Sequence, residues 1–272
     1  MKNNIIKLGI IGVLGASTIT FALLPKEKEQ VSNAATSVET YYANVDTSSR
    51  NNLLNSLKKN TICSNYHTLG YDGLYTAYAT TDARADGKLC DTYSNITNYR
   101  IGPDENHSNY SKEGDNYNRE PSIPQSWWGG GTNNQGNDIY VVYPTDSFVN
   151  GKRSNYPYGE VSNVTYQSAN GYSKLGSGKS SLGYTGTVFE PADEWKGDYA
   201  RVYFYVIATY DTTGWRTDDG SKVFASSVSS PGYGLTTYAL NLFMKWHQQD
   251  PVSEWEIQRN NRGQSVQNNR NP

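Results

Sequence analysis

The sequence has little histidine, little cysteine and no excess of positive charge. Its 272 residues include 3 His and 2 Cys, and the formal net charge is −2. Four of the 24 basic and two of the 26 acidic residues lie within residues 1–35, so the rest of the chain carries a net charge of −4. Tight binding of nucleic acid depends on clustered Lys or Arg at the phosphates. The composition therefore excludes binding through bulk charge and leaves room only for a local basic groove.

The chain has one long apolar run, Leu8–Leu24, and no second one. It follows Lys2 and Lys7, ends at Pro25, and precedes small residues within 32–35. This order predicts a secretory signal peptide and hence a secreted, extracellular bacterial protein with no membrane association after cleavage. The alternative is an uncleaved anchor, for which seventeen residues are short against roughly 30 Å of hydrocarbon.

The two cysteines are Cys63 and Cys90. Disulfides persist in the compartments that exported proteins reach, so we expect a bridge between them. By loop-closure entropy such a bridge would contribute roughly 3 kcal/mol. The alternative is two separate buried thiols.

Local patterns predict an α+β fold in one domain, with residues 1–35 as signal peptide and spacer and residues 36–272 as the domain. Helical spacing of apolar residues covers 38–60 (with Ser48 or Ser49 as cap), 69–79, 190–210 and the region after 234, which Asp250-Pro251 interrupts. Residues 118–144 indicate two short strands around a Gly/Asn-rich loop, the second over 139–143, followed by a helix capped by Thr145 or Asp146. The 23 Tyr and 6 Trp suit either a core or a wet, grooved surface.

The segments NREPSIPQSWW and NDIYVVYPTDSFVNGKRSNYPYGEV resemble the signature of the endonuclease I family. These are secreted, non-specific nucleases of the His-Me (ββα-metal) finger type. GYTGTVFEPADEWKGDYARVYFYVIATY, DGKLCDTYSNI and KWHQQDPVSEWEIQRNN are similar to further parts of the family, so the resemblance spans most of the mature chain. It implies a ββα-metal finger core within a mostly helical domain with long polar loops.

The resemblance also implies a site. A divalent cation, usually Mg²⁺, would be held by Glu120 and Asn150, and Arg153 with Lys152 would bind the phosphate of the substrate. Mg²⁺ keeps several waters, so two protein ligands suffice. Taken alone, Glu120 beside Arg119 is equally compatible with a solvated ion pair, Asn150 with a turn, and the basic pair with an exposed helix end.

The pattern departs from the family where its general base should stand. The family reads N-R-E-H, and this chain has Pro121 after Glu120. Proline has no ionisable side chain. A second departure is Tyr140-Val141, where the family often has two histidines. The remaining histidines are His67, His107 and His247; His247 stands in a family-like stretch, and His107 lies in a polar loop.

Two functions remain open. One is a monomeric, metal-dependent hydrolase of DNA or RNA phosphodiester bonds, weakened by the loss of its base. The other is an inactive nuclease fold that binds nucleic acid or a cell-surface glycan through stacking aromatics. A paralogue without any selected activity would have the same sequence features.

Overall fold

The computed structural model describes residues 38–63, 66–106, 109–131, 133–229 and 232–272. Residues 41–272 form one compact unit. The predicted signal peptide lies outside the described residues. Among those residues, none of the helices has the length and apolar run that a membrane span requires.

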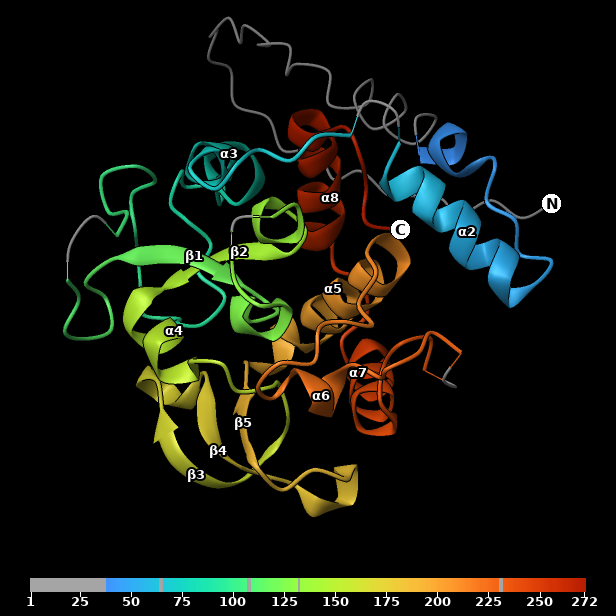
Figure 1. Cartoon of the computed structure of the whole chain (residues 1–272). Helices are drawn as coiled ribbons and strands as arrows, with labels where there is room; N and C mark the ends of the chain where they lie inside the picture. Colours follow the sequence, from blue (N-terminus) through green and yellow to red (C-terminus); the bar gives the residue numbers. More distant parts are fainter. Residues whose placement is uncertain (1–37, 64–65, 107–108, 132, 230–231) are drawn as a thin grey trace, which may run out of the picture. The chain divides into compact units, whose positions relative to one another are not determined.

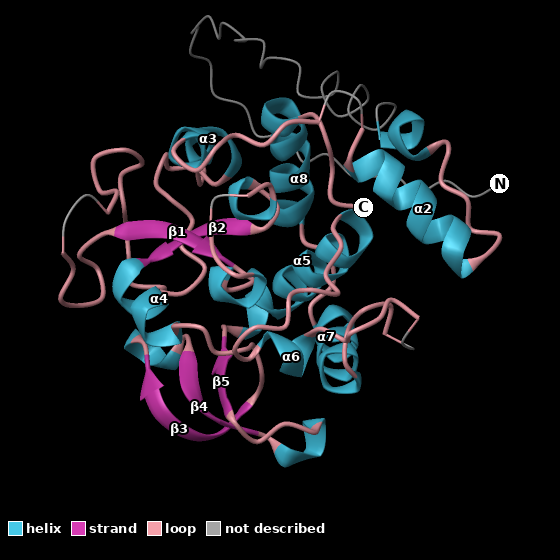
Figure 2. Cartoon of the chain, viewed as in Figure 1, coloured by secondary structure: helices cyan, strands magenta, loops and turns pink. Residues whose placement is uncertain are grey.

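The fold is α+β, as predicted, with helices around two small antiparallel sheets (Figures 1 and 2). The helices of this unit are α2 (Arg50–Thr61), α3 (Gly73–Thr81), α4 (Ser147–Arg153), α5 (Lys196–Thr209), α6 (Gly220–Val223), α7 (Thr237–Gln249) and α8 (Glu254–Gln267). The strands are β1 (Tyr117–Pro121), β2 (Val142–Asp146), β3 (Val161–Gln167), β4 (Lys174–Gly178) and β5 (Thr187–Glu190). One sheet pairs β1 with β2, and the other has the order β3-β4-β5.

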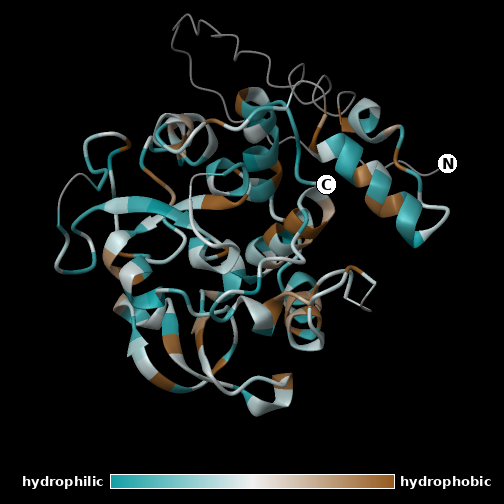
Figure 3. Ribbon diagram, in the orientation of Figure 1, coloured by the Kyte–Doolittle hydropathy of each residue, from teal (hydrophilic) through white to brown (hydrophobic). Residues whose placement is uncertain are grey.

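The core is built around α5, which packs against α7 and α2. The apolar stripe predicted within 190–210 faces this core, with Tyr199, Val202, Tyr203 and Val206 fully buried. Figure 3 shows α5 as an apolar helix in the interior. Tyrosine rings fill much of this space; the Tyr203 and Phe243 rings, for example, stack with centroids 4.2 Å apart. Most of the buried aromatic surface is therefore core.

The predicted order of strand, loop, strand and helix is confirmed in β1, β2 and α4. The β1–β2 register pairs Tyr117 with Asp146 and Pro121 with Val142. Asp146 caps α4, since its Oδ1 accepts a hydrogen bond from Val149 N at 2.8 Å. The second strand starts three residues later than predicted, because the backbone turns at Asp138, whose carbonyl accepts from Val141 N and Val142 N.

Two predicted helices have different limits in the structure. The helix expected over 38–60 is interrupted: α2 begins only after its cap Ser49, whose Oγ accepts from Asn52 N. The helix expected from Glu190 was wrong at its start. Glu190 ends β5 opposite Lys174, and α5 begins at Lys196. The predicted break at Asp250-Pro251 is confirmed between α7 and α8.

The expected disulfide was wrong: Cys63 and Cys90 are free thiols. Cys63 Sγ lies 3.2 Å from the carbonyl of Asn268 near the C-terminus. Cys90 is held elsewhere, with its amide on the carbonyl of Asp82. Each thiol packs against a different part of the chain, so no bridge forms.

Candidate metal and phosphodiester site

The candidate site lies where β1 meets α4 (Figure 1). The extended strand places Glu120 on its inner side, where only 3% of the residue is exposed. One helical turn after the Asp146 cap, α4 presents Asn150, which is half-buried. Two residues that are 30 positions apart in the sequence thus come together, and a hydrogen bond from the Asn150 side chain acts on the pKa of Glu120.

Arg153 is the unexpected part of this site. Its guanidinium is 1% exposed and forms a short ion pair with Glu120 Oε1. It also donates to the carbonyl of Pro121 at 3.1 Å and to that of Ser122 at 2.7 Å. Arg153 is therefore not an exposed basic helix end. Its donors fix the Glu120 carboxylate and the backbone beside it.

Burial shifts the ionisation of this pair. It raises the pKa of the Glu120 carboxyl to about 7, although Arg153 and the hydrogen bonds from Tyr93, Arg153 and Asn150 lower it. For Arg153, burial acts to lower the pKa, but the charge of Glu120 and the neighbouring tyrosines raise it overall. Both partners are charged above neutral pH.

Two oxygen atoms of this site remain for a cation. Arg153 and Tyr93 both donate to Oε1 of Glu120, and neither bonds Oε2. Asn150 turns its Nδ2 to Asn118 Oδ1 at 2.9 Å, so its Oδ1 faces away from that bond. A carboxylate and an amide oxygen suit a hard cation such as Mg²⁺, which fills its other positions with water and phosphate. Elsewhere in the described ranges, no group of three or more His, Cys, Asp or Glu could hold a metal.

Lys152 is the accessible basic residue of α4. It is exposed, and its Nζ lies 4.8 Å from the centre of the Phe148 ring and 5.6 Å from that of Tyr166. Such contacts are weak at exposed sites. The ammonium therefore stays available to an anion near Asn150.

The family's base position holds Pro121 in β1, and no described histidine replaces it. His247 contacts Arg201, and His67 contacts Asn268; neither bonds a residue of the site. His107 lies outside the described residues. Tyr140 points away, because its hydroxyl donates to the carbonyls of Asn260 and Asn269.

Sequence reasoning missed Asn118 and Tyr93. Asn118 accepts the amide of Asn150 and stands in the NREP segment itself, so its place in the motif was an available signal. Tyr93 donates to Glu120 Oε1 at 3.2 Å and is joined to Tyr158 by a 2.7 Å hydroxyl–hydroxyl bond. Nothing in the sequence near Tyr93 pointed to this contact. Burial raises the pKa of both phenols, so neither serves as a base.

Known proteins share this chain's sequence over most of its length. The model of the family described as Endonuclease I matches residues 47–272. An extracellular ribonuclease of Bacillus amyloliquefaciens is 29% identical over 255 residues, covering 92% of this chain and 80% of that protein. An extracellular ribonuclease of Bacillus subtilis (strain 168) is 27% identical over 238 residues, covering 86% and 74%. An endonuclease-1 of Buchnera aphidicola subsp. Baizongia pistaciae (strain Bp) is 24% identical over 135 residues, covering 50% and 44%. With the strand–strand–helix unit and most of the chain in agreement, the protein belongs to the endonuclease I family.

Proposed function

We propose that this protein is a secreted, metal-dependent endonuclease that hydrolyses phosphodiester bonds of RNA or DNA at a reduced rate. The observation that carries this proposal is the convergence of Glu120 and Asn150 beside an exposed Lys152. Export is supported by the apolar N-terminal run and by the two extracellular relatives. Those relatives are named as ribonucleases, so RNA is the first substrate to test.

Each residue then has a separate task. Glu120 and Asn150 would hold a divalent cation, which when bound supplies positive charge at the scissile phosphate. Arg153 and Tyr93 fix the carboxylate, and Asn118 orients the Asn150 amide. Lys152 would bind the phosphate as a point charge.

The missing base sets the expected rate. Loss of a positioned general base costs about 10²- to 10⁴-fold. Water must then be activated without a histidine at position 121, so we expect slow, alkaline-favoured cleavage. Restoring the family's residue with Pro121→His should raise the rate within that range.

The experiment is degradation of RNA and of plasmid DNA by residues 36–272, with magnesium and with EDTA. The native chain should cut only with magnesium, and Asn150→Ala should not cut. Lys59→Ala, an exposed change on α2, controls for general effects of substitution. Cleavage in EDTA, or equal cleavage by Asn150→Ala, would contradict the proposal.

A second function is favoured by Pro121 alone, namely an inactive fold that binds nucleic acid or a cell-surface glycan. Binding of RNA, DNA or a glycan with no cleavage by the native chain, together with cleavage by Pro121→His, would establish it.

A further inference from the structure

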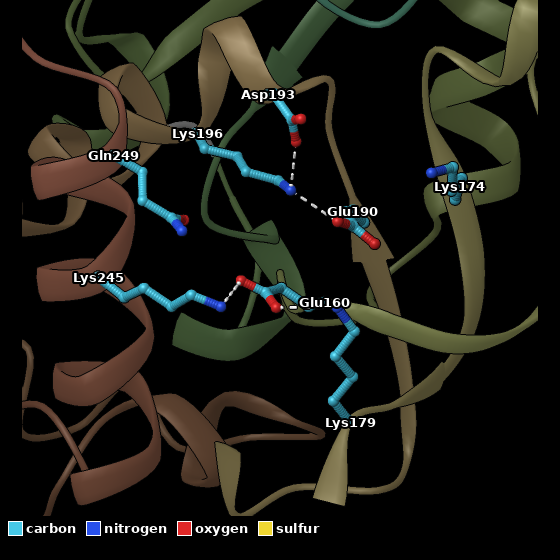
Figure 4. A pocket seen from close by; sticks show the side chains of 8 residues that line it. All are labelled: Glu160, Lys174, Lys179, Glu190, Asp193, Lys196, Lys245 and Gln249. Carbon is cyan, nitrogen blue, oxygen red and sulfur yellow. Dashed lines mark hydrogen bonds and ion pairs between the residues drawn. The ribbon is translucent and has the colours of Figure 1, made fainter. Parts of the chain in front are cut away.

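A second polar site lies between the three-stranded sheet and α7, built from residues outside the candidate nuclease site. It is a cavity of about 520 Å³. Figure 4 shows the eight residues that line it, which are Glu160, Lys174, Lys179, Glu190, Asp193, Lys196, Lys245 and Gln249. Seven of the eight are charged, in a protein whose net charge is negative.

One part of the lining is neutralised internally. Lys196 Nζ donates to Glu190 Oε1 and Asp193 Oδ1, each at 2.6 Å, and its side chain is 8% exposed. The other oxygen of Glu190 accepts from Val161 N at 2.8 Å. These contacts hold the start of α5 to the end of β5 and leave this ammonium little access to a ligand.

The other part has an excess of positive charge. Lys179 and Lys245 both donate to Glu160, at 3.1 and 2.5 Å. Trp246 Nε1 adds a 3.3 Å bond to the same carboxylate. Burial acts to raise the pKa of Glu160, but the two lysines outweigh it and lower the pKa. A buried, ionised carboxylate therefore holds two ammonium groups at the cavity.

Lys174 adds a third ammonium. It stands opposite Glu190 in the β4–β5 register, yet both Glu190 oxygens are taken by Lys196 and Val161. Across the described ranges we find no hydrogen bond or ion pair of Lys174 Nζ. Lys174, Lys179 and Lys245 against Glu160 alone leave a charge of +2 on this side of the cavity.

These ammonium groups retain donors for a ligand. An ammonium has three N–H groups, and Lys179 and Lys245 each use one on Glu160. Their side chains are 46% and 40% exposed. The lining has no aromatic or aliphatic residue, so it offers nothing to a base or an apolar ligand. A tetrahedral oxyanion with two negative charges matches both the charge and the donors.

We propose that this cavity is a phosphate-binding site in which Lys174, Lys179 and Lys245 hold a phosphoryl group, with Glu160 positioning the last two. The group is either free inorganic phosphate or the terminal phosphate of a short oligonucleotide. The proposal does not depend on cleavage at Glu120 and Asn150, because no lining residue belongs to that site.

The test is isothermal titration calorimetry of residues 36–272 in low salt and EDTA, where metal-dependent cleavage cannot occur. The ligands are inorganic phosphate and a dinucleotide with or without a 5′-phosphate. Lys174→Gln removes one donor without breaking a bond of the fold, and Lys59→Gln removes the same charge from exposed α2.

We expect phosphate binding that Lys174→Gln weakens about tenfold, as for one hydrogen bond to a charged group, and that Lys59→Gln leaves unchanged. If only the 5′-phosphorylated dinucleotide shows this loss, the site takes a terminal phosphate; if inorganic phosphate shows it too, the phosphoryl group alone suffices. Both results support the site. It is overturned if neither ligand binds, or if Lys174→Gln and Lys59→Gln bind alike.

Discussion

Replacing Arg153 with methionine should destabilise the protein more than any other charge removal on α4. The change keeps the length of the side chain but leaves Glu120 as a buried carboxylate without a cation. It also removes the donors to the carbonyls of Pro121 and Ser122. Removing one partner of a buried ion pair costs about 3–5 kcal/mol. That is a large part of the roughly 5–15 kcal/mol that keeps a domain folded.

The measurement is urea unfolding of residues 36–272 at pH 7.5 in EDTA, followed by tryptophan fluorescence. For a chain of this size each kcal/mol lowers the melting temperature by about 2–4 °C, so Arg153→Met should melt roughly 6–20 °C lower. The matched control is Lys152→Met. Its ammonium is exposed and contacts only aromatic rings, so its cost should stay below about 1 kcal/mol.

A double variant separates charge from packing. Adding Glu120→Gln to Arg153→Met removes the unpaired charge, so it should recover part of the lost stability. If Arg153→Met instead unfolded at the same urea concentration as Lys152→Met, Glu120 would have to reach solvent. The described burial of the site would then be refuted.

Three further outcomes follow from the structure. Asn118→Leu should lower magnesium-dependent cleavage by roughly tenfold, as expected for one lost orienting hydrogen bond, with unchanged circular dichroism; unchanged cleavage would rule out a positioning role. The pKa of Glu160 is lowered on folding, so its contribution is full above the ordinary value of 4.5 and is lost as the pH falls through the folded value. The stability gap between native and Glu160→Gln should thus be wide at pH 7 and narrow below pH 4.5 in urea melts, and a gap independent of pH would contradict the two lysine contacts. Cys63 and Cys90 should both react with a thiol reagent after unfolding without reductant, with Cys90 the slower in the folded protein because burial raises its pKa; absence of both reactions would indicate a disulfide.

Features set by neighbours in the chain were predictable. The Asp146 cap, the apolar stripe of α5 and the break at Asp250-Pro251 each depend on a few adjacent residues. The pairing of Glu120 with Asn150 came from the family resemblance rather than from local pattern. These are the parts that the structure reproduces.

Features set by distant contacts were not predictable. Glu190 follows helix-compatible signals but joins a strand, because β4 pairs beside it. Arg153 has the sequence context of a surface residue, yet the approach of β1 surrounds it with carbonyls and a carboxylate. The cysteines are kept apart because the C-terminal segment takes up one of them. The lysine cavity joins β4, β5 and α7, which no local pattern brings together.

The most direct test of the central claim, that Glu120 and Asn150 hold a divalent cation, is Mn²⁺ binding followed by electron paramagnetic resonance without substrate. Residues 36–272 should bind one Mn²⁺ that Mg²⁺ displaces, and Asn150→Ala and Glu120→Gln should each lose it. The absence of binding by the native chain, or equal binding by both variants, would contradict a metal site between β1 and α4.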